Sequence, residues 1–287
     1  MIFIEAVKEY NFLQQALITS ILVGISSGVI GSFVVLRGMS LMGDAISHAV
    51  LPGVAISYML GINFLIGSTI FGILAALGIG FISDKSPLKN DSAIGIILSS
   101  FLALGMILVT MAKSSTNLYH ILFGNILAVQ RVDMWITLVV TMLVLLLVII
   151  FYKELFVSTF DETIAKSYGL NTKVIHYFLM VLLTLVTVVA LQTVGVILVV
   201  AMLVIPASTA YLLTNKLSHM IVLSTIIGMV SSVSGLYFSF VNNFASGPTI
   251  VMSATILFIL AFIFSKKSTL SFKSNKKRGK KSNEISV

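Results

Sequence analysis

Residues Gly43–Gly53 read Gly-Asp-Ala-Ile-Ser-His-Ala-Val-Leu-Pro-Gly, which sets a carboxylate and an imidazole inside an apolar run. Asp44 and His48 are four residues apart, so in a helix their side chains lie on the same face. Pro52 follows four residues after His48 and cannot donate the usual backbone hydrogen bond, which predicts a kink. The rest of the sequence has to explain why such a polar pair lies among apolar residues.

Composition indicates that the surroundings are a lipid bilayer. The chain has 287 residues, of which 58% are hydrophobic and only 10% are charged, whereas soluble domains carry about 25% charged residues. Apolar runs long enough to cross a bilayer recur along almost the whole length. The predicted fold class is therefore an all-α polytopic membrane protein, and this composition excludes a soluble enzyme. We expect one transmembrane domain over residues 1–265 and a separate tail over residues 266–287.

About nine transmembrane helices are predicted. Short polar breaks at Arg37–Gly43 and near Gln192 make eight or ten possible, and a short interfacial segment, Met1–Phe12, precedes the first span. The expected spans are Leu13–Leu36, Asp44–Leu60, Phe64–Ile82, Ser92–Ala112, Met134–Tyr152, Val174–Leu191, Val194–Thr214, His219–Phe240 and Pro248–Ser265.

The distribution of positive charge predicts the orientation. The tail Lys266–Val287 carries eight Lys and Arg residues against Glu284, and we interpret it as a disordered cytoplasmic tail that contacts anionic lipid, with no role in nucleic-acid binding. With the tail inside and nine spans alternating, fifteen of the 18 Lys and Arg residues fall on the inner side. This asymmetry agrees with the positive-inside rule and places the N-terminus outside. The inner residues before the tail are Arg37, Lys85, Lys89, Lys153, Lys166, Lys173 and Lys216, and the outer ones are Lys8, Lys113 and Arg131.

Asp44 and His48 have two possible roles. Imidazole and carboxylate ligands suit divalent cations such as Mn²⁺, Fe²⁺ or Zn²⁺, and ionisable groups inside a membrane usually face a cavity or a partner. A pair is an incomplete metal site, but a two-fold dimer would supply two of each residue. The alternative is a structural Asp–His hydrogen bond at a helix start, with Asp44 as a cap. Residue spacing alone does not separate the two. The chain has no cysteine, so thiolate ligands and disulfides are absent.

A polar insert between two spans predicts a short helix on the inner face. Asp161 and Glu162 favour the first turn of a helix, and Gly169 suits its end. Such a helix could dock a cytoplasmic partner or could be a plain surface turn.

No catalytic constellation accompanies these features. Gly24–Gly28 matches the G-x-S-x-G pattern, but it lies within a membrane span, where small residues serve helix packing. Pro206, in the seventh predicted span, is expected to kink its helix.

Four stretches together resemble the permease subunit of the metal-ion ABC importers, the family that carries manganese, zinc or iron. They are Gly43–Gly53, the Asp161/Ala165/Gly169 insert, Gly195–Val199 leading into Pro206-Ala207, and Phe123-Gly124-Asn125. The resemblance covers roughly residues 13–265 and leaves out the tail.

This resemblance implies a fold similar to the importers of cobalamin and haem-type ligands, in a bacterial cell membrane. It implies a homodimer with an external metal-binding lipoprotein and two cytoplasmic ATP-binding subunits. Asp44 and His48 would line the translocation path, near the kinks at Pro52 and Pro206. Asp161, Glu162, Ala165 and Gly169 would form the coupling helix. The chain itself would be no enzyme and would hold no permanent cofactor, only the transported ion. The alternative function is an ion-coupled secondary transporter that uses Asp44 and His48 as a proton relay.

Overall fold

The computed structural model describes residues 2–112 and 126–265, and all regular structure within these ranges is helical. The described elements are α1 (Ile2–Glu9), α2 (Asn11–Leu36), α3 (Ser40–Ala49), α4 (Leu51–Leu60), α5 (Phe64–Lys85), α6 (Asn90–Met111), η1 (Ile126–Ala128), α8 (Arg131–Ile150), α9 (Tyr152–Phe160), α10 (Glu162–Ser167), α11 (Thr172–Val194), α12 (Val196–Leu213), α13 (Leu217–Asn242) and α14 (Ser246–Phe264).

The predicted membrane fold is confirmed. In the described part of the chain, eight helices are long and apolar enough to cross a membrane, namely α2, α5, α6, α8, α11, α12, α13 and α14. Each of them coincides with one predicted span, with ends that differ by a few residues. The predicted tail, residues 266–287, lies outside the described residues, as does the Phe123-Gly124-Asn125 stretch.

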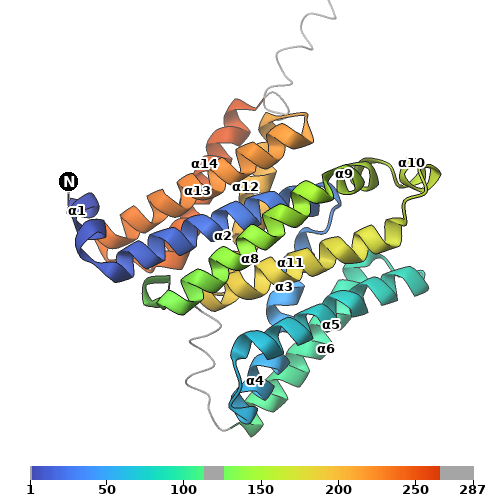
Figure 1. The fold of residues 1–287 in the computed structure, drawn as a ribbon, viewed down its shortest axis with the longest axis horizontal. Coiled ribbons are helices and arrows are strands. Elements are labelled where there is room, and N and C mark those ends of the chain that lie inside the picture. Colours follow the sequence, from blue (N-terminus) through green and yellow to red (C-terminus); the bar gives the residue numbers. More distant parts are fainter. Residues whose placement is uncertain (1, 113–125, 266–287) are drawn as a thin grey trace, which may run out of the picture.

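The remaining predicted span, Asp44–Leu60, is not a single helix. It begins earlier, at Ser40, and is divided into α3 and α4 at Val50. Pro52 lies in the first turn of α4, where its missing N–H leaves no helical bond unmade, so the chain starts a new helix there. Each half has 10 residues and is too short to cross a bilayer. Together they connect the end of α2 to the start of α5 (Figure 1).

The helices alternate in direction, so the connections gather at two ends. At one end lie the C-termini of α2, α5 and α12, together with α9, α10 and the start of α11 (Figure 1). We call this the basic end, because it carries seven described Lys and Arg residues, whereas the opposite end carries Lys8 and Arg131. The seven are Arg37, Lys85, Lys89, Lys153, Lys166, Lys173 and Lys216, the same residues that the sequence assigns to one side.

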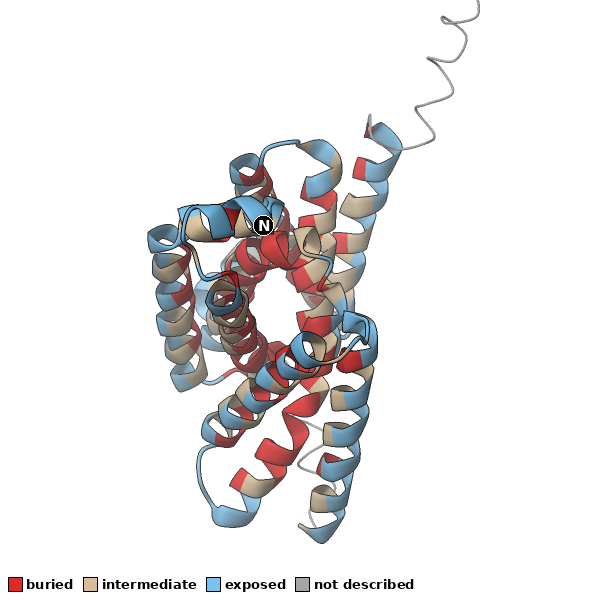
Figure 2. Cartoon of the chain, turned by 90° about the vertical axis from the view of Figure 1, so that its right-hand side faces the viewer, coloured by how far each residue is buried: buried red, intermediate tan, exposed pale blue. Residues whose placement is uncertain are grey.

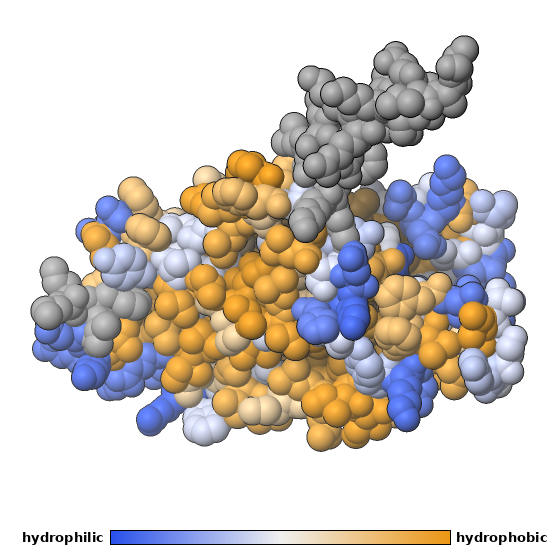
Figure 3. All heavy atoms as spheres, turned by 90° about the horizontal axis from the view of Figure 1, so that it is seen from above, coloured by the Kyte–Doolittle hydropathy of each residue, from blue (hydrophilic) through white to orange (hydrophobic). Residues whose placement is uncertain are grey.

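Helix α2 occupies the middle of the bundle and packs against α8, α11, α12 and α13. Close contact is possible because Gly24 of α2 lies against Gly228 of α13, where an added Cβ would come within 2.9 Å of backbone atoms. Small residues that let backbones approach are the usual means of helix packing in lipid. Buried residues turn toward the centre and exposed ones face outward (Figure 2). Seen from above, apolar atoms form a belt between two hydrophilic ends (Figure 3).

The polar insert holds two helices, of which the sequence predicted only one. Helix α9 continues almost directly from α8 and has only one buried residue, Leu155. Lys153 and Glu154 interrupt the apolar run at its start, so the sequence predicts a polar insert there. Helix α10 agrees with the predicted short helix between Asp161 and Gly169.

Candidate functional site

Helix α3 is buried on all sides but one. Met42, Ala45 and Ile46 are at most 1% exposed, because α3 packs against α5, α6, α11 and α12. The remaining face carries Leu41, which is 56% exposed, and the side chains of Asp44 and His48, which are 41% and 34% exposed. We call Leu41, Asp44 and His48 the open stripe of α3. A carboxylate and an imidazole are thus accessible on a helix that is otherwise enclosed.

The two polar side chains are close, but they do not form a tight pair. His48 Nε2 lies 3.6 Å from Asp44 Oδ1, which is longer than a hydrogen bond. Helix α3 begins four residues before Asp44, and Met39 holds its N-cap position, so the capping role considered for Asp44 is wrong. Both side chains therefore keep atoms free to bind a ligand.

The described residues supply two such ligands at this place. Within the described residues, no group of three or more His, Cys, Asp or Glu side chains could hold a metal ion. A divalent transition metal needs four or more ligands. Water, a second protein chain or both would have to complete a site here.

Glycines allow α3 to pack closely on α12, and α12 to pack closely on α2. Gly43 faces Leu203 of α12, and an added Cβ would come within 2.9 Å of the Leu203 side chain. Gly31 of α2 meets the backbone carbonyl of the same Leu203. Pro206 is buried inside α12, one turn further along. Helix α3 therefore packs closely on α12 at Gly43, and α12 packs closely on α2 at Gly31.

Helix α10 is built as the sequence predicts. The Asp161 side chain caps it by accepting a hydrogen bond from Ile164 N at 2.9 Å, and Gly169 ends it with a φ of 76°. Ala165 is fully buried and anchors the helix. Glu162 pairs with Lys166 Nζ at 2.8 Å and accepts from Thr172 Oγ1 at 3.1 Å. These contacts lower the pKa of Glu162, with the hydrogen bond from Lys166 as the largest cause.

The outer face of this region is apolar, a feature that the sequence did not predict. Phe160, Ile164 and Tyr168 are 57%, 48% and 76% exposed and recur every four residues. We call them the apolar row. Phe160 ends α9 and Ile164 lies in α10, with the extended Asp161 between them, so their spacing in the sequence could not by itself place them on one face. Exposed large apolar side chains at the charged end make this region a candidate surface for binding another protein.

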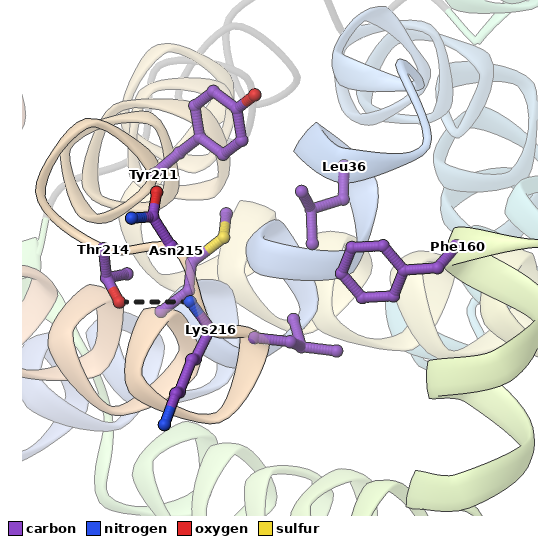
Figure 4. A pocket seen from close by; sticks show the side chains of 8 residues that line it. Leu36, Phe160, Tyr211, Thr214, Asn215 and Lys216 are labelled. Atoms are coloured by element: carbon purple, nitrogen blue, oxygen red, sulfur yellow. Dashed lines mark hydrogen bonds between the residues drawn. The ribbon is translucent and has the colours of Figure 1, made fainter. Parts of the chain in front are cut away.

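A groove of about 240 Å³ adjoins the apolar row at the basic end. In Figure 4, Leu36 from α2 and Phe160 from α9 point toward one another, and the turn after α12 forms the other side. In that turn, Thr214 Oγ1 accepts a hydrogen bond from Lys216 N at 3.3 Å. The full lining is Leu36, Phe160, Tyr211, Thr214, Asn215, Lys216, Leu217 and Met220.

Residues 9–265 match the model of the ABC 3 transport family. The chain belongs to that family. It is thus a multi-pass membrane protein of the ABC transporters, and its helix arrangement belongs to a permease subunit.

Relatives extend over nearly the whole chain. The ABC 3 transport chain is 65% identical over 278 residues to a Listeria monocytogenes protein named manganese transport system membrane protein MntC, covering 97% of this chain and 99% of that one. It is 54% identical over 265 residues to the manganese import system permease protein ScaB of Streptococcus gordonii, covering 92% and 95%.

Solved structures agree with the fold. PsaBC from Streptococcus pneumoniae, in complex with Fab, superposes with a TM-score of 0.86 at 54% identity, covering 96% of this ABC 3 transport chain and 100% of that chain. A metal-chelate type ABC transporter in an inward-facing conformation gives a TM-score of 0.64 at 16% identity, covering 91% and 85%. The second likeness concerns the fold alone and agrees with the predicted similarity to importers of larger ligands.

Proposed function

We propose that this chain is the permease subunit of an ATP-driven importer of manganese ions. Family membership favours this function over the alternative of an ion-coupled secondary transporter. The relatives named for manganese narrow the predicted cargo from manganese, zinc or iron to manganese. The observation that carries the proposal is the open stripe of α3, where Asp44 and His48 lie accessible on an otherwise buried helix.

The metal site is completed by a second copy of the chain. One copy supplies an Asp44 and a His48, and a two-fold axis beside α3 brings in two more. Four ligands of this kind suit Mn²⁺, which accepts carboxylate and imidazole. The imidazole must be neutral and the carboxylate ionised for binding. Few ligands and partial exposure favour release, as a transport path requires.

The basic end faces the cytoplasm in this proposal. Seven described positive charges lie there against two at the opposite end, and cytoplasmic loops carry such an excess. The C-terminus is then inside and the N-terminus outside. An external metal-binding lipoprotein delivers the ion at the opposite end.

The ATP-binding subunits dock on α10. The apolar row is supported by an anchored, capped helix, so it offers a rigid contact surface at the cytoplasmic side. Binding and hydrolysis of ATP by those subunits shift α10 and thereby rock the two permease copies. The permease residues themselves break no bond and hold no permanent cofactor.

The test is metal uptake by the complete importer. We expect Asp44→Ala and His48→Ala each to lower Mn²⁺ uptake by at least about tenfold, since each removes two ligands from the dimeric site. The matched control is His219→Ala, because His219 is exposed at the basic end and away from the stripe. Assembly with the ATP-binding subunits is checked by size-exclusion chromatography. Full uptake by the two site variants in an intact complex would refute the proposed site.

A further inference from the structure

Arg37 lies at the turn between α2 and α3. It caps α2, and the turn that follows is held by Gly38 N bonding to Val35 O at 3.1 Å and by Met39 N bonding to Val34 O at 2.9 Å. Gly38 has a φ of 67°, the left-handed conformation that ends a helix, and α3 begins at Ser40. The turn is therefore short and bonded at several points. A displacement of the Arg37 backbone would therefore move the start of α3 as well.

The side chain of Arg37 crosses to α9. Its Nε donates to Thr159 Oγ1 at 3.1 Å, and its Nη2 donates to Ser158 Oγ at 3.0 Å. The two hydroxyl groups are adjacent in sequence and accept hydrogen bonds from two nitrogens of the same planar guanidinium. This double contact fixes both the orientation of the guanidinium and its distance from α9. Burial lowers the pKa of Arg37, and the charge of Glu162 opposes that shift. The guanidinium stays charged in any case.

Ser158 and Thr159 form the last turn of α9, and α10 follows immediately. Asp161 ends α9 and caps α10, so one residue belongs to both helices. Helix α10 packs against α9 and α11. A shift of α10 must therefore move the two hydroxyl groups that Arg37 holds.

A second connection runs beside the first. Thr172, at the start of α11, donates to Glu162 of α10, and the neighbouring Lys173 binds Asp84 at the end of α5 at 3.1 Å. Both connections border one polar cavity of about 220 Å³. Its lining comes from the ends of α2, α5 and α9 and from the starts of α6, α10 and α11, namely Arg37, Ser83, Asp84, Asn90, Ser158, Glu162, Thr172, Lys173 and His176. Space and polar groups at this place allow the helix ends to shift relative to one another.

We propose that Arg37 is the positioning residue that links the α9–α10 unit to α3 and so couples ATP hydrolysis to movement of the metal-binding stripe. The inference rests on the proposed function, because it takes α10 as the docking helix and α3 as the metal helix. Asp44 follows Arg37 by seven residues along a bonded turn and one helical turn. By contrast, Arg37 and its hydroxyl partners are separated by more than 120 residues in sequence. Arg37 thus adds a direct side-chain link between these two parts of the path, beside the packing of α9 on α2 and on α11.

The experiment uses the complete importer in liposomes and measures Mn²⁺ uptake and phosphate release in the same vesicles. In Arg37→Gln we expect uptake per ATP to fall about tenfold while hydrolysis stays near the wild-type rate, because charge-assisted hydrogen bonds at this place are lost. Arg37→Lys keeps the positive charge but loses the planar guanidinium that donates two hydrogen bonds. We therefore expect its Mn²⁺ uptake per ATP to lie between the values of Arg37→Gln and of the wild type. Ser158→Ala with Thr159→Val removes the acceptors and should lower the ratio in the same direction.

Lys89→Gln is the matched control, since it removes one exposed positive charge from the same end. A merely structural role for Arg37 would lower uptake and hydrolysis in proportion and leave their ratio unchanged, which would overturn the inference. Should Arg37→Gln fail to assemble, the Ser158/Thr159 double variant tests the role of Arg37 through the same measurement, Mn²⁺ uptake per ATP hydrolysed. The wild-type complex separates the two proposals: absence of Mn²⁺ uptake there refutes the proposed function, whereas normal wild-type uptake with an unchanged variant ratio refutes only the role of Arg37.

Discussion

His48 is the residue on which metal selectivity should depend. Asp44 alone would present carboxylate oxygens, which suit Mg²⁺ and Ca²⁺ as well as Mn²⁺, whereas imidazole favours transition metals. In the proposed site, the nitrogen ligand would give a preference over the far more abundant hard cations. The 3.6 Å between His48 Nε2 and Asp44 Oδ1 leaves both atoms available to one ion.

We expect His48→Asp to weaken discrimination against Mg²⁺. The variant site has carboxylates only, so the excess of Mg²⁺ needed to halve Mn²⁺ uptake should fall by about tenfold. The measurement is competition for Mn²⁺ uptake in liposomes that contain the complete importer. His219→Asp, the same exchange on an exposed part of α13, should leave the competition unchanged. Equal Mg²⁺ sensitivity of His48→Asp and wild type would show that His48 does not select the metal.

Glycine contacts decide how closely the helices pack. Gly53 of α4 and Gly67 of α5 face one another, and a Cβ on either would overlap the backbone carbonyl of the other. Backbone atoms cannot rotate away as a side chain can, so the helices would have to separate. The second half of the Gly43–Gly53 stretch thus serves packing, while the first half carries the polar stripe.

Gly53→Ala should lower the stability of the protein by about 1–3 kcal/mol, the usual cost of overpacking. Gly95→Ala is its control, because Gly95 lies within α6 and a Cβ there meets nothing within 4 Å. That variant should be neutral or slightly stabilising, since alanine favours helix over glycine. The check is the midpoint of thermal unfolding in detergent. A Gly53→Ala protein as stable as Gly95→Ala would contradict the close contact between α4 and α5.

Helix α10 is expected to loosen in acid. The hydrogen bonds from Lys166 and Thr172 lower the pKa of Glu162. The ionised carboxylate therefore stabilises α10 fully at any pH above the ordinary pKa of a glutamate, about 4.3, and this stabilisation is lost as the pH falls through the lowered pKa. Exchange of the α10 amides, corrected for the intrinsic rate, should stay constant from about pH 7 to 5 and rise below about pH 4. Glu162→Gln should show the faster exchange already at neutral pH. Glu9→Gln, an exposed site at the opposite end, should not change exchange in α10; slow α10 exchange in Glu162→Gln would contradict the role of this anchor.

Long apolar runs made the eight continuous helices predictable, because length and hydropathy alone identify a bilayer-spanning helix. Pro52 was interpreted as a kink within one span, but the chain breaks at Val50, since a proline is as acceptable in a first helical turn as at a bend. Local pattern could not show that Arg37 bonds to Ser158 and Thr159, because contacts between distant segments leave no periodic signal. Sequence could place Asp44 and His48 on one face, but only packing shows that this face is open.

The open stripe of α3 also bears on how two copies assemble. Leu41 is a large apolar residue that is 56% exposed, one turn before Asp44 on the same face. An apolar side chain beside two ligands fits a surface that a second copy covers in the proposed dimer. If a two-fold axis runs beside α3, then Leu41 of one copy lies near Leu41 of the other, because a residue close to a two-fold axis is also close to its own symmetry mate.

The chain has no cysteine, so a single one can report this proximity without background. We expect Leu41→Cys to give a cross-linked dimer with a short bismaleimide in membranes. Leu146→Cys is the matched control, since Leu146 of α8 is also a leucine that is 56% exposed but lies on a different helix, away from the open stripe. Added Mn²⁺ should alter the yield for Leu41→Cys alone, because the ion would draw together the two Asp44–His48 pairs one turn away. Equal cross-linking of both variants would show that the two-fold axis does not run beside α3, and so would the absence of cross-linking in Leu41→Cys within an active importer. In either case the second copy would not supply its Asp44 and His48 to the proposed metal site.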